Sequence, residues 1–247
     1  MKVLSVFGTR PEAIKMAPLL KAMQASRKLE SKVAVSAQHR EMLDQVLQLF
    51  DIRPDYDLNL MRPGQSLSDI TGAVLTGLHA ILEQEQPDLL LVHGDTTTTF
   101  AGALAAYYHR IPVGHVEAGL RSGDKYAPYP EECNRRLTGV LADLHFAPTE
   151  AAAANLRAEN VPEPSIFITG NTVIDALFSA LDKPCPLEGL GLETVDWSKK
   201  IILMTCHRRE NWGRPMEEIF RATADFLRTN GDCQLILPLH KNPLVRE

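Results

Sequence analysis

Acidic side chains at three points of the sequence have the type and the setting for proton transfer. Asp95 and Glu117 each follow a short apolar run, and Glu131 begins a stretch of helical pattern. Carboxyl groups in a partly buried cleft can hold different protonation states, so that one donates a proton while another accepts one. Asp95, Glu117 and Glu131 are therefore candidates for acid/base chemistry.

Each of these carboxylates also has an ordinary structural interpretation. Asp95 has threonine neighbours and is of a type that caps the helix that follows it. Glu117 can form a buried ion pair with Arg121, and Glu131 and Glu132 can stabilise a helix by interacting with its dipole. Local sequence leaves both interpretations open. Convergence of the three acids on one edge of a sheet would favour the functional one.

Residues 8–12 have the composition of an anion site. Gly8 permits a tight turn, a helix N-terminus follows, and Arg10 and Lys15 add positive charge. A diphosphate suits this loop, and a solvated helix start is the alternative. The loop lacks both the Gly-x-Gly-x-x-Gly fingerprint of dinucleotide-binding proteins and the Walker pattern, so no NAD or other redox cofactor is predicted.

A histidine and an acidic pair raise two further possibilities. His207 follows a later apolar run and can donate or accept a proton near neutral pH, with a structural role as the alternative. Asp55 and Asp57 resemble the short acidic motif of metal-dependent glycosyltransferases. No supporting ligands surround them, and the remaining histidines lack metal-ligand spacing. No metal site is predicted.

The elements that position these residues alternate along the chain. Strands are expected at residues 2–7, 32–37, 89–93, 112–116, 144–147 and 165–169, and helices at residues 11–23, 41–50, 66–85, 98–109, 131–142 and 149–159. Continuous apolar strands between helices predict a parallel sheet covered on both faces, the doubly wound α/β class. Such sheets bind ligands beyond the carboxyl ends of their strands.

Prolines and glycines interrupt this alternation after residue 182. We therefore expect an N-terminal domain at residues 1–182, a linker at residues 183–199 and the start of a second domain at residues 200–247. The second domain is expected to contain strands at residues 200–205 and 234–239 with a helix between them. So small a sheet cannot bury its own faces. The sequence predicts an incomplete second domain, or a unit that packs on the first.

Composition narrows the class of protein. Apolar residues form 45% and charged residues 23% of the chain, which is typical of a soluble globular protein. A net charge of −5 gives no reason to expect a nucleic-acid or membrane partner, and no run approaches the ~18 apolar residues of a membrane span. The N-terminal apolar run is too short for a signal peptide. Four scattered cysteines indicate reduced thiols. The expected compartment is the cytoplasm.

Taken in order, the polar loops resemble those of the bacterial non-hydrolysing UDP-N-acetylglucosamine 2-epimerases. The motifs include Gly-Thr-Arg-Pro-Glu, His-Gly-Asp-Thr-Thr and Gly-Asn-Thr-Val-Ile-Asp, and the matching stretches are residues 7–18, 37–44, 92–99, 113–121, 170–175 and 207–211. The resemblance implies two Rossmann-like domains of the glycosyltransferase-B type, the second incomplete here. Family members continue beyond residue 247 with a segment that holds uracil and phosphates. Residues 1–247 alone are therefore expected to bind nucleotide poorly and to show no measurable epimerisation.

The resemblance also implies a reaction. An enzyme base removes the C2 proton of UDP-N-acetylglucosamine while UDP leaves from C1, and re-addition of UDP with protonation of the opposite face gives UDP-N-acetylmannosamine for cell-surface polysaccharide synthesis. Asp95, Glu117, Glu131 and His207 match the acid/base and site residues of the family. Which carboxylate serves which sugar face stays open. The alternatives are a hydrolysing epimerase, a retaining glycosyltransferase, or an inactive fragment that binds a nucleotide sugar.

Binding residues follow from the same resemblance. Arg10 and Lys15 match nucleotide contacts. Gln38, Glu131 and Arg208 lie in stretches that match a neighbouring site where substrate activates many bacterial members. The family members are usually homodimers, and the partners implied here are UDP-N-acetylglucosamine, UDP and a second copy of the chain.

Overall fold

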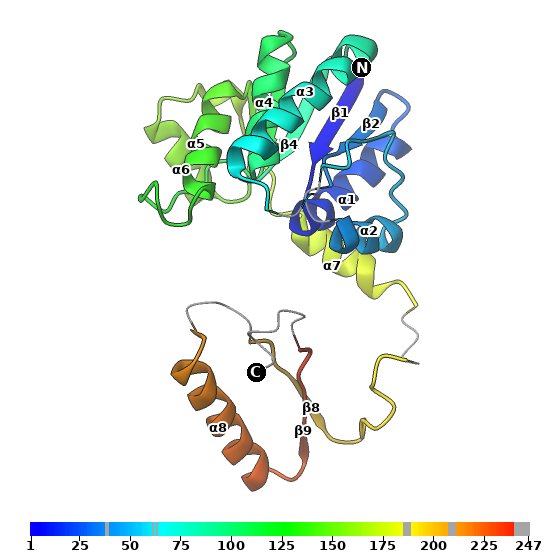
Figure 1. Cartoon of the computed structure of the whole chain (residues 1–247), viewed down its shortest axis with the longest axis vertical. Coiled ribbons are helices and arrows are strands. Elements are labelled where there is room, and N and C mark those ends of the chain that lie inside the picture. The colour runs from blue at the N-terminus through cyan, green and yellow to red at the C-terminus, as the bar shows by residue number, and fades with distance from the viewer. Residues whose placement is uncertain (38–39, 61, 63, 185–188, 207–210, 240–247) are drawn as a thin grey trace. The chain divides into compact units, whose positions relative to one another are not determined.

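The computed structural model describes residues 1–37, 40–60, 62, 64–184, 189–206 and 211–239. The chain divides into two compact units, Met1–Lys183 and Pro184–Glu247 (Figure 1). Within the described residues, no helix is long and apolar enough to cross a membrane.

A seven-stranded sheet forms the centre of the first unit, and all of its strands are parallel. In spatial order the strands are β3 (Tyr56–Asp57), β2 (Glu30–Val35), β1 (Lys2–Phe7), β4 (Leu89–His93), β5 (Val113–Val116), β6 (Leu144–Ala147) and β7 (Ile166–Ile168). The order reverses between β1 and β4. Doubly wound sheets bind ligands at this reversal, because the loops that leave the two strands diverge there. The predicted α/β class is confirmed.

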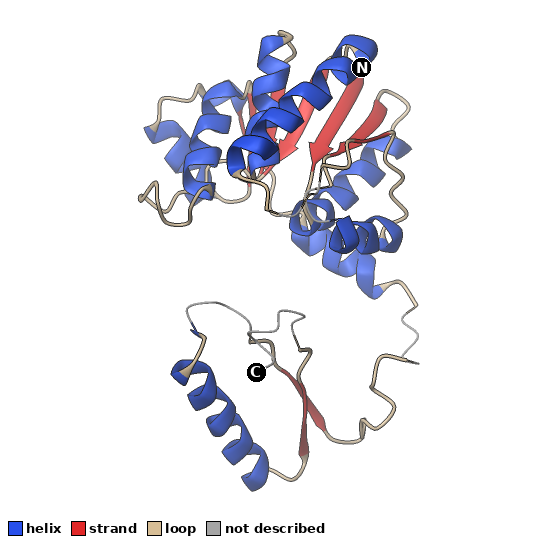
Figure 2. Cartoon of the chain, viewed as in Figure 1, coloured by secondary structure: helices blue, strands red, loops and turns tan. Residues whose placement is uncertain are grey.

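Helices cover both faces of this sheet (Figure 2). They are α1 (Arg10–Ala25), α2 (Arg40–Leu49), α3 (Leu67–Glu85), α4 (Thr97–Tyr108), α5 (Glu131–Leu141), α6 (Glu150–Ala158) and α7 (Val173–Leu181), with a short 3-10 helix at Glu163–Ser165. The predicted start of α3 is confirmed. Ser66 caps it, since its hydroxyl accepts from the backbone N–H of Asp69 and the Asp69 carboxylate accepts from the backbone N–H of Ser66.

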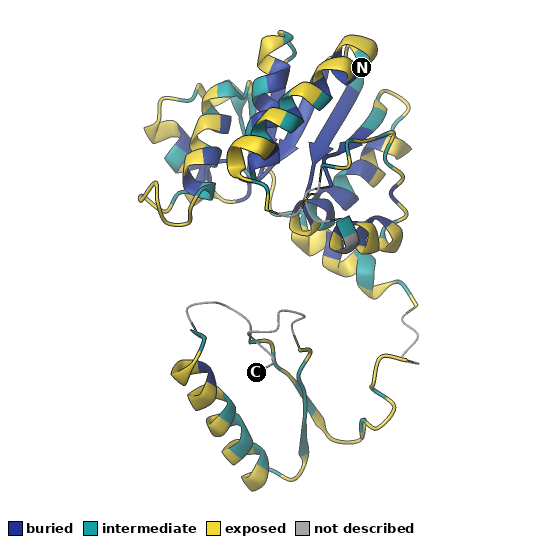
Figure 3. Ribbon diagram, viewed as in Figure 1, coloured by how far each residue is buried: buried dark blue, intermediate teal, exposed yellow. Residues whose placement is uncertain are grey.

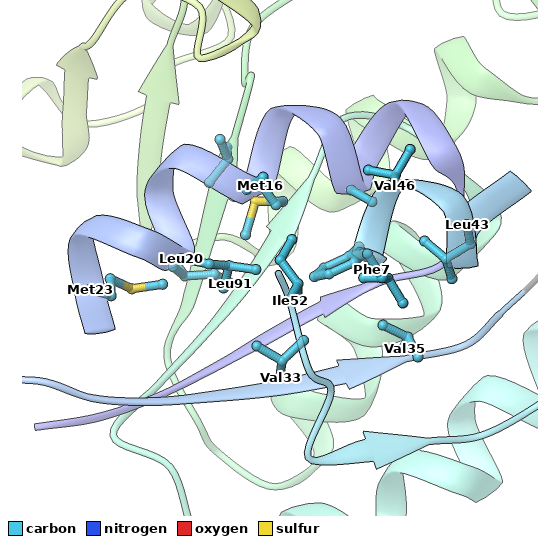
Figure 4. Close-up of a cluster of buried hydrophobic side chains, with 14 of the residues drawn as sticks. Phe7, Met16, Leu20, Met23, Val33, Val35, Leu43, Val46, Ile52 and Leu91 are labelled. Carbon is cyan, nitrogen blue, oxygen red and sulfur yellow. The ribbon is translucent and has the colours of Figure 1, made fainter. Parts of the chain in front are cut away.

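Two large apolar clusters, one on each face of the sheet, and a smaller one at α6 form the core of the first unit. Figure 3 shows the central strands as buried. Val3 and Phe7 point toward α1 and α2, whereas Leu4 and Val6 point toward α3 and α4. This alternation along β1 buries both faces. Figure 4 shows Phe7 packed among Met16, Leu43 and other apolar side chains. Full burial of one such side chain contributes roughly 1.5–3 kcal/mol.

The second unit has a much smaller described core. β8 (Lys200–Leu203) pairs in parallel with β9 (Cys233–Ile236), and α8 (Arg214–Thr229) connects them. Both strands end before the predicted residues 205 and 239. Within the described part of this unit, Met216 is the one apolar side chain that is buried.

Three elements of the first unit lie outside the sequence predictions, namely β3, the 3-10 helix at Glu163–Ser165 and α7. β3 contains two residues and pairs with the edge of β2. It occupies the acidic stretch that resembles a metal motif, and both of its acids have cationic partners. Asp55 pairs with Lys32, and Asp57 pairs with Arg40. Only the first turn of α7 overlaps a predicted feature, the motif at residues 170–175.

Candidate active site

The loops that follow β1, β4 and β5 lie next to each other at the carboxyl edge of the sheet. Val6 is paired with Val92, and His93 is paired with Val116. The residues that follow these strands, which include Asp95 and Glu117, therefore emerge on neighbouring strands. The prediction places three acids, Asp95, Glu117 and Glu131, at one sheet edge. The strand pairing confirms it for Asp95 and Glu117, and the helix that begins at Glu131 contacts the Asp95 loop through Asn134.

Glu117 is held by side chains from three other segments. Its Oε1 accepts hydrogen bonds from Lys15 Nζ at 2.5 Å and from Asn171 Nδ2 at 2.8 Å. Its Oε2 lies 3.7 Å from Nε2 of His93. The backbone of Glu117 is left-handed, with a φ of 63°, which non-glycine residues adopt infrequently. This backbone conformation raises the free energy of the folded state, and the surrounding contacts must offset that increase.

The charge of Glu117 follows from these neighbours. Burial raises the pKa of its carboxyl group, but the hydrogen bond and positive charge of Lys15, together with the hydrogen bond from Asn171, hold the pKa below its usual range. The group is therefore ionised at neutral pH and can accept a proton. The alternative pairing with Arg121 is wrong, because Arg121 binds Glu159 through two nitrogens, at 2.8 and 2.6 Å.

His93 is a buried histidine beside this carboxylate. It is 3% exposed, and neither ring nitrogen has a hydrogen-bond partner in the described structure. Burial lowers its pKa to about 4, despite the opposing effect of Glu117. A neutral imidazole thus lies 3.7 Å from the Glu117 carboxylate.

Asp95 forms an ion pair with Arg135 of α5 and is partly exposed. The interpretation of Asp95 as the cap of the next helix is wrong. Thr96 is the N-cap of α4, and its hydroxyl accepts from the backbone N–H of Thr99 at 3.1 Å. The Asp95 side chain therefore pairs with α5 and does not cap α4. Asn134 of the same helix α5 donates to the Asp95 backbone carbonyl at 3.0 Å.

Side-chain donors fix the loop that carries Asp95. The hydroxyl of Thr99 lies 2.6 Å from the carbonyl oxygen of His93, and Nε2 of His115 lies 2.7 Å from the carbonyl oxygen of Gly94. Burial lowers the pKa of His115 to about 3, so this imidazole stays neutral and can donate. Groups on α4, β5 and α5 thus restrain successive peptides, which pre-organises the Asp95 carboxylate.

The predicted anion loop differs from its expected form. The backbone N–H groups of Gly8 and Thr9 donate to Oε2 of Glu12, at 3.0 and 2.7 Å, so an internal carboxyl group already occupies them. Lys15 is paired with Glu117. Arg10 is exposed and makes no hydrogen bond or ion pair within the described part of the chain. Of the two predicted cations, Arg10 is the one with a free guanidinium for an incoming anion.

Glu131 and Glu132 both lie in the first turn of α5, as their helix-dipole interpretation predicts. Glu131 is half-buried and has no partner among the described residues, whereas Glu132 is fully buried. Its Oε2 accepts from Arg135 at 3.1 Å and from the backbone N–H of Ser122 at 3.0 Å. Glu131 stands one turn before Arg135, the partner of Asp95. It therefore lies on the same helix face as Arg135.

Three predicted site residues, Gln38, His207 and Arg208, lie outside the described residues. The structure adds His93, Asn171 and Arg135, listed here because each contacts a predicted carboxylate. His93 and Asn171 fall in the stretches that carry the family resemblance, and that position in the sequence could have identified them as site residues. Arg135 lies outside those stretches, and its role depends on the packing of α5.

A doubly wound parallel sheet with paired carboxylates and cations near its strand reversal defines a Rossmann-like α/β protein, a class in which ligands bind at this edge of the sheet. The chain belongs to the UDP-N-acetylglucosamine 2-epimerase family, whose model matches residues 21–247. This match confirms the family that the motifs indicate.

Individual relatives agree with this assignment. The chain is 59% identical to the UDP-N-acetylglucosamine 2-epimerase of Escherichia coli K12, and the match covers all of this chain and 67% of that protein. It is 58% identical to a putative UDP-N-acetylglucosamine 2-epimerase of Thermotoga maritima, over all of this chain and 65% of that protein. The chain thus spans about two thirds of the length of these relatives.

Solved structures confirm the fold class, including its glycosyltransferase-B type. The UDP-GlcNAc 2-epimerase of Neisseria meningitidis bound to UDP-GlcNAc is 51% identical, with a TM-score of 0.86 over all of this chain and 68% of that one. The Methanocaldococcus jannaschii enzyme in complex with UDP-GlcNAc and UDP is 33% identical, with a TM-score of 0.79 over 100% of this chain and 67% of that one. A galactosyltransferase of the lipopolysaccharide outer core, 12% identical with a TM-score of 0.53 over 96% of this chain and 60% of that one, shares the fold alone.

Proposed function

We propose that the protein to which this chain belongs interconverts UDP-N-acetylglucosamine and UDP-N-acetylmannosamine without hydrolysis. The observation that carries this proposal is the ionised carboxylate of Glu117, held beside the Asp95 loop at the strand reversal. Removing a carbon-bound proton requires a base that is ionised at the working pH, and inversion at C2 requires a second group on the opposite face. Two carboxyl groups on neighbouring loops meet both requirements.

The proposed steps balance without a redox cofactor. A base takes the C2 proton, and the C–H electron pair forms the C1–C2 double bond as the C1–O bond to UDP breaks. The resulting 2-acetamidoglucal then regains UDP at C1 while a proton is delivered to the other face of C2. Asp95, Glu117, Glu131 and His207 are the proposed acid/base and site residues. We assign the accepting role to Glu117, because its neighbours keep it ionised.

Lys15 has a double role in this proposal. It neutralises Glu117 in the free protein, and the charge of an incoming diphosphate competes for the same ammonium group. Partial transfer of Lys15 to the diphosphate would make Glu117 more basic at the moment when substrate is bound. Arg10, exposed and unpaired among the described residues, supplies the second phosphate contact.

The remaining assignments rest on the family resemblance. Residues 200–247 begin the nucleotide-binding domain after a linker at residues 183–199. The enzyme is a cytoplasmic homodimer that supplies cell-surface polysaccharide synthesis. Substrate also binds beside the active site at Gln38, Glu131 and Arg208.

Solvent deuterium tests the reaction. The full-length enzyme, incubated with UDP-N-acetylglucosamine in deuterated water, should place deuterium at C2 of both nucleotide sugars and leave the sugar on UDP. Products with only protium at C2 would contradict proton abstraction. Release of free N-acetylmannosamine would indicate the hydrolysing alternative, and turnover that needs an acceptor would indicate a glycosyltransferase.

A further inference from the structure

Two hydrogen bonds fix the orientation of the Asn171 side-chain amide. Its Oδ1 accepts from the backbone N–H of Val173 at 3.0 Å, which forms an Asx turn at the start of α7. An amide nitrogen cannot accept from an N–H group, so Nδ2 must lie on the opposite side of the amide. That nitrogen donates to Oε1 of Glu117 at 2.8 Å. The backbone at the start of α7 therefore aims one neutral donor at the proposed base.

The two donors to Oε1 of Glu117 differ in charge. Lys15 belongs to α1, Asn171 lies two residues before α7, and these two helices pack against each other. The ammonium group of Lys15 is attracted to the diphosphate of the proposed substrate. The amide of Asn171 is neutral, and its hydrogen bond from Val173 restrains it. It therefore has no comparable reason to leave Glu117 when the diphosphate arrives.

The Glu117 carboxylate has few other partners once Lys15 turns away. Its Oε2 lies 3.7 Å from Nε2 of His93, which is too long for a hydrogen bond. Among the described residues, Asn171 is then the remaining side-chain donor to this carboxylate. A displacement of about 1 Å in a reacting group can cost roughly 100-fold in rate. A donor that stays in place while substrate is bound thus preserves the geometry of the base.

We propose that Asn171 is a positioning residue whose amide keeps the Glu117 carboxylate in place when Lys15 turns to the diphosphate of the substrate. The hydrogen bonds of Asn171 carry this inference. Its effect on turnover rests on the proposed epimerase function.

Asn171→Asp isolates the donor, because aspartate has the shape of asparagine and keeps the oxygen that accepts from Val173. Its second oxygen replaces the donor to Glu117 by a negative charge, and an adjacent like charge raises the pKa of a carboxyl group. The carbon-13 NMR titration of the Glu117 carboxyl group in the 247-residue chain should therefore move to higher pH. Asn171→Ala removes the donor without adding a charge and should give a smaller shift in the same direction.

Thr172→Asp is the matched control for the added charge. It places the same charge one residue later, at a position whose side chain does not cap α7. It should move the Glu117 titration much less than Asn171→Asp does. An unchanged titration in Asn171→Asp, or equal shifts in the two aspartate variants, would overturn the proposal.

The pH profiles of the full-length enzyme test when Asn171 acts. The acid limb of kcat/KM reports the free enzyme, in which Lys15 still holds Glu117, and the acid limb of kcat reports the substrate complex. Asn171→Asp should move both limbs to higher pH and the kcat limb further. It should also lower kcat at neutral pH by roughly tenfold or more, while circular dichroism shows a folded protein.

Equal shifts of the two limbs, or a kcat profile that matches wild type, would refute a role of Asn171 in the substrate complex. A purely structural role would leave both limbs in place, because aspartate retains the Asx turn. A full-length wild type without epimerase activity would instead refute the proposed function and leave the NMR result intact.

Discussion

The ammonium group of Lys15 lies 2.5 Å from Oε1 of Glu117, although the two residues are 102 positions apart. Sequence analysis assigns Lys15 to a phosphate and Glu117 to proton transfer. The structure makes them one ion pair, with Asn171 as a second donor to the same oxygen. The basicity of the candidate base therefore depends on a residue of the candidate anion loop.

Replacing Lys15 by methionine should raise the pKa of the Glu117 carboxyl group. Burial already acts in that direction, and the variant removes the hydrogen bond and charge that oppose it. The pKa can be followed by the carboxyl carbon-13 shift of Glu117 in an NMR titration. Lys21→Met, an exposed lysine of the same helix, is the control and should leave it unchanged. An unchanged titration in both variants would contradict the coupling.

Stability should depend on pH through Glu117 with a definite sign. Because its folded pKa is lowered, Glu117 contributes stability above its usual pKa of ~4.3, and this contribution is lost as the pH falls through the folded pKa. Glu117→Gln should therefore lose less stability than wild type on acidification. Urea unfolding should be followed by far-ultraviolet circular dichroism, since both tryptophans, Trp197 and Trp212, lie in the second unit. Identical acid sensitivity of the two proteins would count against the assignment.

Gly8→Ala should destabilise the first unit by about 1–3 kcal/mol through overpacking. A Cβ at this position would lie 2.0 Å from Oγ of Ser36 and 2.7 Å from Oγ1 of Thr98, which are hydrogen-bonded to each other at 2.8 Å. Gly72→Ala is the matched control, because Gly72 lies within α3 and a Cβ there has no neighbour within 4 Å. It should stabilise the protein by ~0.5–1 kcal/mol. Comparable unfolding midpoints for the two variants would refute the close approach at Gly8.

Amide substitutions test the carboxylates in the full-length enzyme. Asp95→Asn, Glu117→Gln and Glu131→Gln should each lower the rate by ~10²–10⁴-fold, because the amide keeps the shape and removes proton transfer. Glu83→Gln, a solvent-exposed residue of α3, is the control and should retain wild-type kinetics. If all three variants stayed within about threefold of wild type, the carboxylate assignment would be wrong.

Local signals in the sequence account for the elements that were predicted correctly. β1 and β4 are continuous apolar runs, and α3 begins at a capping box, so neighbouring residues alone specify them. β3 was missed because a two-residue edge strand has no periodicity of its own; its pairing with β2 defines it. Its acids offered a misleading metal motif, since their lysine and arginine partners come from other segments.

The sequence predicted which loops form the candidate site, but it did not predict which side chains in those loops pair with each other. Parallel strands place Asp95 and Glu117 at one edge, and this follows from the class of fold. Asp95 and Thr96 are both good helix caps, and local sequence does not choose between them. Asp95 instead forms an ion pair with Arg135, which lies 40 positions later in the chain, and this leaves Thr96 as the N-cap. Such long-range partners depend on packing, which one sequence without relatives does not specify.

Residues 1–183 should fold as an independent domain, and residues 184–247 alone should not. The first unit buries apolar side chains on both faces of a seven-stranded sheet. The described part of the second unit pairs two strands, leaves Leu203 and Phe226 exposed, and buries Met216 alone among its apolar side chains. With one buried apolar side chain among its described residues, this unit has too small a core for independent stability.

Thermal unfolding of the two fragments checks this expectation. Residues 1–183 should show a single cooperative transition by circular dichroism, as a domain with its own core does. The fragment 184–247 should show no cooperative transition, and its tryptophan emission should be that of exposed indole, since Trp197 is 55% exposed even in the longer chain. A cooperative transition in the short fragment, or failure of residues 1–183 to fold, would contradict this expectation.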